Sequence, residues 1–239
     1  LAHRCYLWKK IASADIKRAS HPADYYEKLH AQFSDDDTCL SAAQIDKDIK
    51  RTFPGHRIYQ TKLGQAQLSR VLKACAWRNP SIGYCQSMNF LAAMLLLISP
   101  EIDAFWLLCA IVEDILPNYF SPDMFAVRVD QMVVSDLFSK IMPELSAHMQ
   151  EQGIFLQAQS IQWFLCLFIG FLPTETVLRI FDHLFFCGSY ILFVTTFGLL
   201  KINEKVLLAS HSYEALFDSL KHLKHGTYDC DKLFSTGIA

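Results

Sequence analysis

The chain has 239 residues, of which 52% are hydrophobic and 19% are charged, and its formal net charge is −2. This composition excludes a disordered or low-complexity protein, because such chains combine low hydrophobicity with high charge. It also lacks the basic excess that nucleic-acid-binding domains usually show. The length suffices for one large domain or two small ones, with enough buried surface to fold without disulfides or metals.

Helical periodicity dominates the chain. A first helix is expected over residues 42–51, opened by a capping box at Ser41 and Gln44 and stopped by Pro54 and Gly55. The later expected helices cover residues 63–77, 85–98 and 102–116, two segments of 123–150 divided near Pro143, and then 160–169, 174–186, 190–208 and 212–224. The only candidate strand is short, at residues 153–156. This pattern predicts an all-α fold.

The helices are expected to form one large domain over residues 1–239 with two helical lobes. The division between the lobes is predicted near residues 150–153, which gives an N-terminal lobe of about 1–150 and a C-terminal lobe of about 151–239. Many of the predicted helices are apolar on more than one side, as expected of inner helices in a large helical domain.

Two long apolar stretches, residues 154–172 and 184–200, raise the question of membrane insertion. The first contains three glutamines and a serine, and the second is interrupted by a Cys-Gly-Ser sequence and two threonines. A membrane-spanning helix needs about 20 predominantly apolar residues. We therefore expect both stretches to form buried core helices.

The cysteines bear on the cellular location. There are eight, and no two form a C-x-x-C pair. Cys109 and Cys166 lie inside apolar runs, which is typical of small buried hydrophobic residues. We therefore expect reduced thiols in a cytoplasmic protein. Because the sequence begins with Leu1 rather than methionine, we also expect it to be a piece of a longer chain.

Polar residues stand out in two segments of the first half of the chain. Asp48 and Arg51 are three residues apart on one helix face, and Arg51 lies at the expected helix exit, where it can project into a partner while Asp48 holds its stem. The alternative is an ordinary surface ion pair. Gln86 and Asn89 have the same spacing near a helix start, where amides can position a water or a phosphate or can simply cap the helix.

A third polar pair lies in the second half. Arg179 and Asp182 are again three residues apart, within a mostly apolar helix. A buried pair of this kind is often purely structural.

The three segments match three motifs in order. The first motif, I-x-x-D-x-x-R-T-x-P, is matched by Ile45, Asp48, Arg51, Thr52 and Pro54. The second, Y-x-Q-G-M-N, is matched by Tyr84, Gln86, Met88 and Asn89, with Ser87 at the glycine position. The third, W-F … L-P … R-x-W-D, is matched by Trp163, Phe164, Leu172, Pro173, Arg179 and Asp182, with Phe181 in place of the second tryptophan. Over roughly residues 3–234 the chain resembles the TBC domain of Rab GTPase-activating proteins.

This resemblance implies a fold and a mechanism. The fold is the all-α TBC domain, and the activity is acceleration of GTP hydrolysis by a Rab-family small GTPase. Arg51 corresponds to the family's arginine finger and Gln86 to its glutamine finger, both supplied in trans. Asp48 is then expected to orient Arg51, with Thr52 and Pro54 in support. Tyr84 and Asn89 are expected to shape the loop that presents Gln86, and Arg179 and Asp182 to brace the groove between the lobes.

The resemblance also implies the partner and the cofactors. The partner is a Rab in its GTP-bound state, which carries the GTP and Mg²⁺, so the chain needs no cofactor or metal of its own. It would act as an activator in vesicle trafficking rather than as a stand-alone enzyme. We expect recruitment to endomembranes through the partner or through flanking regions, without membrane insertion and without nucleic acid.

Several alternatives stay open. A catalytically weak or inactive TBC-type module would bind GTPases or other proteins as a trafficking scaffold, and Ser87 favours this version because a serine can strain a loop built for glycine. A thiol nucleophile at Cys85 has no local signature. The residues His222, His225, Asp229, Cys230 and Asp231 include metal-ligand types, but a zinc site needs four converging ligands and a solvated helix end is the favoured interpretation. No phosphate-binding G-x-x-x-x-G-K-[ST] motif is present.

Overall fold

The computed structural model describes residues 2–34, 40–224 and 227–238, and every regular element in these ranges is helical. The helices of the first half are α1 (Ala2–Ile11), α2 (Ala14–Ala19), α3 (Tyr25–Ser34), α4 (Leu40–Ile49), α5 (Lys62–Arg78), α6 (Met88–Ile98), α7 (Glu101–Ala110) and the π-helical turn η1 (Ile111–Ile115). Those of the second half are α8 (Phe125–Ile141), α9 (Pro143–Glu151), α10 (Leu156–Leu165), α11 (Thr174–Cys187), α12 (Tyr190–Leu208), α13 (Tyr213–Lys221) and α14 (Cys230–Ile238). The predicted all-α fold is confirmed.

The chain divides into two compact units, residues 1–124 and 125–239. The boundary therefore precedes α8, whereas the sequence placed it near residues 150–153, after α9. The reason is tertiary packing that the local pattern does not reveal. Helix α8 packs against α10, and α9 packs against α12, so helices on both sides of the expected boundary share one core.

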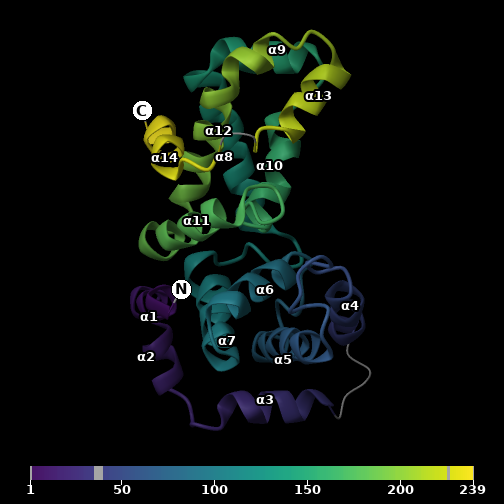
Figure 1. Cartoon of the computed structure of the whole chain (residues 1–239), viewed down its shortest axis with the longest axis vertical. Helices are drawn as coiled ribbons and strands as arrows, with labels where there is room; N and C mark the ends of the chain where they lie inside the picture. The colour runs from purple at the N-terminus through teal and green to yellow at the C-terminus, as the bar shows by residue number, and fades with distance from the viewer. Residues whose placement is uncertain (1, 35–39, 225–226, 239) are drawn as a thin grey trace. The chain divides into compact units, whose positions relative to one another are not determined.

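In the first unit, α5 lies at the centre of its neighbours. It packs against α3, α4, α6 and α7 (Figure 1). Its buried face carries Leu68, Val71, Leu72 and Cys75, at the spacing of an amphipathic helix. Each buried leucine stabilises the fold by roughly 1.5–3 kcal/mol. This helix fixes the start of the loop that leads to Gln86.

The second unit is built around α12, which packs against α9, α10, α11, α13 and α14. The contact with α14 is unusually close at two glycines. A Cβ atom on Gly198 would overlap the carbonyl oxygen of Leu233, and one on Gly237 would overlap that of Val194. The missing side chains thus allow the two helix backbones to meet.

Three local expectations differ from the structure. Residues 153–156 form no strand, because Gly153 adopts φ 74° in a turn and α10 begins at Leu156. Ser41 lies inside α4 and so does not cap it, while the residues before Leu40 lie outside the described part of the chain. Helix α4 ends at Ile49, well before Pro54. In the ranges described, no helix combines the length and apolarity needed to cross a membrane.

Candidate functional site

The end of α4 is organised around the buried carboxylate of Asp48, which has no exposed surface. Its Oδ1 atom lies 2.8 Å from Nη2 of Arg51 and accepts a hydrogen bond from Nε2 of Gln44 at 3.2 Å. The carbonyl oxygen of Asp48 accepts from the Arg51 backbone N–H at 3.1 Å, which turns the chain out of the helix. The Arg51 side chain remains 55% exposed. Asp48 therefore holds one side of a guanidinium that otherwise reaches solvent.

Tyr84 joins the second motif to the first. Its hydroxyl donates to Oδ2 of Asp48 at 2.7 Å. Burial raises the pKa of Tyr84, and the hydrogen bond to Asp48 raises it further, so the phenol keeps its proton and remains a donor. Both carboxylate oxygens of Asp48 thus have partners. Those of Oδ1 come from the first motif segment around α4, and that of Oδ2 comes from the loop before α6.

A second connection runs through Thr52 and Asn89. The Thr52 hydroxyl donates to the carbonyl oxygen of Asp48 at 2.7 Å and accepts from Nδ2 of Asn89, also at 2.7 Å. Oδ1 of Asn89 accepts from the backbone N–H of Ser87 at 3.2 Å. All four residues are buried. A chain of hydrogen bonds thereby leads from the end of α4 to the residue next to Gln86.

Gln86 lies in a turn and its side chain is exposed. The sequence predicted a helix from residue 85, but α6 begins at Met88 with Ser87 as its N-cap residue, so Gln86 precedes the helix. Its neighbour Cys85 is buried, and burial raises the pKa of the thiol. A raised pKa disfavours the thiolate, which argues against Cys85 as a nucleophile.

Ser87 is the strained residue of the site. It adopts φ 115° and ψ −31°, in a region that residues with a side chain rarely enter. Its hydroxyl is buried and, among the described residues, has no hydrogen-bond partner. The backbone strain costs on the order of 1–3 kcal/mol, and an unsatisfied buried hydroxyl costs a similar amount.

We expect Ser87→Ala to raise the free energy of unfolding by about 1 kcal/mol, because it removes the unsatisfied hydroxyl. Ser87→Gly should raise it by about 2 kcal/mol, because it also relieves the strain, less the backbone entropy of glycine. Urea denaturation of the three proteins tests this order. A loss of stability in Ser87→Ala would show that the hydroxyl has a partner.

Aromatic packing places the segment after Arg51. Phe53 has φ 44° and packs against Tyr59 and Phe90, with ring centroids 6.0 Å and 5.7 Å apart. Pro54 is exposed, and its carbonyl oxygen accepts from Nε2 of Gln60 at 3.1 Å. Phe53 was not predicted as part of the site. No helical spacing marks it, because Tyr59 follows six residues later across a turn and Phe90 lies in α6.

Gln44 was also missed as a site residue. The sequence assigned it to a capping box, yet it donates to Asp48 one helical turn later. Its spacing of four residues before Asp48 was the available signal, because side chains four apart lie on the same helix face.

Arg179 and Asp182 belong to the second unit, whereas the site residues described above belong to the first. Nη2 of Arg179 lies 3.1 Å from Oδ1 of Asp231 on α14, and the Asp231 side chain is 90% exposed. An exposed pair of this kind contributes about 1 kcal/mol or less to stability. Their role at a groove between lobes stays a prediction.

The candidate metal ligands near residue 225 gain no support from the geometry. His225 lies outside the described residues. Within the described ranges, no three His, Cys, Asp or Glu side chains are placed to hold a metal ion.

Comparison with known proteins identifies related chains. The family model of the Rab-GTPase-TBC domain matches residues 1–208. Small G protein signaling modulator 3 from mouse is 37% identical over 238 residues, which is 98% of this chain and 32% of that protein. The chain thus spans about a third of the length of that relative. Growth hormone-regulated TBC protein 1 from human is 35% identical over 232 residues, covering 95% of this chain and 68% of that protein.

A solved structure shares the architecture. The flagellar RabGAP TBC domain of Chlamydomonas superposes with a TM-score of 0.89 at 31% identity, over 99% of this chain and 79% of that one. Helices, motifs and relatives agree, and the chain belongs to the Rab-GTPase-TBC domain family.

Proposed function

We propose that this chain accelerates GTP hydrolysis by a Rab-family small GTPase in its GTP-bound form, with Arg51 and Gln86 supplied in trans. One observation carries the proposal. The two exposed side chains stand on separate loops, and the buried Asp48 and Asn89, together with the half-buried Tyr84, connect those loops. An ordinary surface ion pair does not require buried hydrogen bonds of this kind beneath it.

Arg51 is suited to stabilise the negative charge that develops on a transferring phosphoryl group. In GTP hydrolysis the charge spreads over the oxygens of the transferring phosphoryl group, and an arginine finger contributes about 10³–10⁵ in rate. A guanidinium has five N–H donors. Asp48 contacts Arg51 through Nη2, and its carboxylate also accepts from Gln44 and Tyr84, so other N–H donors of Arg51 remain for a ligand. Asp48 restricts the side chain before the GTPase binds, so less conformational entropy is lost on docking.

Gln86 is suited to orient the attacking water. A carboxamide donates and accepts hydrogen bonds at once, and it needs no proton transfer to do so. In this proposal the GTPase brings GTP and Mg²⁺, and the chain contributes no cofactor. The similar flagellar TBC domain of Chlamydomonas is a RabGAP domain, which supports the same partner class.

A panel of purified Rab proteins loaded with GTP tests the proposal. Single-turnover phosphate release should accelerate at least about 10³-fold with one or more of them. The doubly substituted Arg51→Ala, Gln86→Ala chain should bind the same Rab without accelerating it. No acceleration of any Rab by the parent chain would contradict the proposal.

Ser87 favours one second candidate, a TBC module that binds GTPases with little or no catalysis. Its strained backbone and buried hydroxyl raise the cost of the conformation that presents Gln86. The same panel separates the two. A binding module would hold the GTP form of a Rab in a pull-down without accelerating it, while a general scaffold would bind GTP and GDP forms alike. Roles in vesicle trafficking and endomembrane recruitment depend on which Rab responds.

A further inference from the structure

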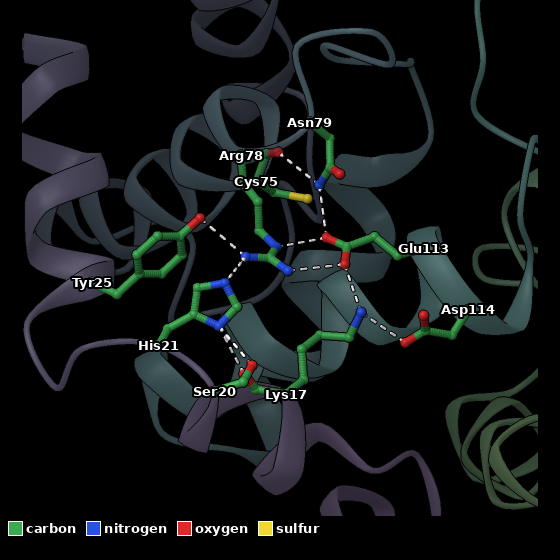
Figure 2. Close-up of polar contacts among 9 residues, drawn as sticks. All are labelled: Lys17, Ser20, His21, Tyr25, Cys75, Arg78, Asn79, Glu113 and Asp114. Carbon is green, nitrogen blue, oxygen red and sulfur yellow. Dashed lines mark hydrogen bonds and ion pairs between the residues drawn. The ribbon is translucent and has the colours of Figure 1, made fainter.

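A partly buried ion network lies at the end of α5, around Glu113 of η1 (Figure 2). Its carboxylate pairs with Arg78 through two contacts, Nε to Oε1 at 2.7 Å and Nη2 to Oε2 at 3.1 Å. Oε2 also accepts from Nζ of Lys17 on α2 at 2.6 Å. Burial alone would raise the pKa of Glu113, but the hydrogen bonds from Arg78, Lys17 and Asn79 lower it to about 2. The carboxylate is therefore ionised throughout the neutral range.

Arg78 is held from its other side as well. Its Nη1 donates to the Tyr25 hydroxyl at 3.0 Å and lies 3.0 Å from Nε2 of His21. The guanidinium also stacks over the rings of Tyr25 and Trp106. Because arginine only donates, Nε2 of His21 must be the acceptor, and the proton sits on Nδ1, which lies 2.9 Å from the carbonyl oxygen of Lys17. The network thus has one consistent hydrogen-bonding arrangement.

Asn79 connects this network to the loop at residues 79–87. It is the C-cap residue of α5, and its Nδ2 donates to Oε1 of Glu113 at 2.9 Å. The backbone carbonyl oxygen of Asn79 accepts from the backbone N–H groups of Ile82 and Gly83, at 3.0 Å and 2.8 Å. Glu113 therefore fixes the residue around which the first turn of the loop closes. At its far end the loop is held by the contacts of Tyr84 and Asn89, with Gln86 between them.

A second arginine–glutamate pair shows what is particular to Glu113. Nε and Nη2 of Arg70 lie 2.6 Å from the two carboxylate oxygens of Glu101, and that pair also joins α5 to the α7 region. Each pair also has a tyrosine partner: the Tyr26 hydroxyl donates to Glu101, whereas the Tyr25 hydroxyl accepts from Arg78. Neither Arg70 nor Tyr26 belongs to the 79–87 loop. If the Glu113 network served only to join helices, it would duplicate this pair.

We propose that Glu113 and Asn79 are positioning residues that hold the 79–87 loop in the conformation presenting Gln86. The effect on the loop stands on the contacts above, and its catalytic consequence rests on the proposed function. The α2 helix is thereby linked to the site through Lys17, although neither Lys17 nor Glu113 touches Gln86. Lys17 also reaches Asp114, the residue after Glu113, so its ammonium lies 2.6 Å from Glu113 and 2.8 Å from Asp114.

The test compares Glu113→Gln and Asn79→Ala with the matched control Glu101→Gln. Hydrogen exchange at the Ile82 and Gly83 amides should become about tenfold faster or more in the first two variants and stay unchanged in the control. The maximal rate of Rab GTP hydrolysis at saturating chain should fall about 10–10²-fold, because displaced catalytic groups cost rates of this order. The concentration of chain that gives half the maximal rate should not change.

The two claims can fail separately. Loop exchange in Asn79→Ala and Glu113→Gln that matches the parent, or that Glu101→Gln reproduces, overturns the positioning role whatever the activity. If the parent chain accelerates no Rab, the proposed function fails, and the exchange measurement still decides whether the network holds the loop. Should Glu113→Gln unfold, Asn79→Ala carries the test, since it leaves the Arg78–Glu113 pair in place.

Discussion

Replacement of Arg51 by lysine is expected to lower the rate of Rab GTP hydrolysis about 10²-fold, and replacement by alanine about 10³-fold or more. Lysine keeps the positive charge but loses the planar fork that can meet a phosphoryl oxygen and Asp48 at the same time. Single-turnover hydrolysis at saturating chain measures the effect. The loss should lie in the maximal rate, because the interaction strengthens as charge develops in the transition state.

The lysine variant is the more informative of the two. Asp48 has no exposed surface, and alanine at position 51 leaves its carboxylate with Tyr84 and Gln44 as donors but without a counter-charge. Arg57, exposed in the segment that follows, provides a matched control. Arg57→Lys should leave the maximal rate unchanged. Full activity in Arg51→Lys would mean that charge alone suffices. Equal losses of rate in Arg51→Lys and Arg57→Lys would point to docking rather than catalysis.

The sequence predicted those helices whose formation depends mainly on their own residues. Residues 190–208 form α12 as expected, and the expected helix 63–77 is α5, because both segments are long and contain no proline. No helix was expected at 230–238, where α14 forms. Its docking needs the glycine contact between Gly198 and the Leu233 backbone, a pairing across distant segments that no local pattern reveals.

The same distinction applies to the candidate site. The spacing of Asp48 and Arg51 indicated their ion pair, because residues three apart share a helix face. The contacts of Tyr84 with Asp48 and of Asn89 with Thr52 depend on the tertiary fold. The motif resemblance grouped these residues without giving their geometry. It also flagged Ser87, whose positive φ explains why the helix begins later than periodicity suggested.

Replacement of Gln86 by alanine is expected to lower the maximal rate of hydrolysis about 10²-fold or more, since one preorganised hydrogen-bonding group at a reacting centre contributes this much. Gln86 is exposed and precedes α6, so its removal should leave the free energy of unfolding within about 0.5 kcal/mol of the parent value. Gln86→Glu should be at least as slow, because a carboxylate near the phosphates adds repulsion and loses the N–H donor. Single-turnover phosphate release at saturating chain measures all three proteins.

Gln86→Asn and a change in the partner complete the test. Asparagine keeps the carboxamide but is one methylene shorter, so a rate between those of parent and alanine variant would show that reach matters as well as chemistry. If Gln86 orients the water, replacing the Rab's own catalytic glutamine with alanine should barely change the stimulated rate. If the parent chain instead loses its effect on that Rab while Gln86→Ala retains it on the unaltered Rab, the water is oriented by the GTPase. Arg51 would then be the only finger supplied in trans.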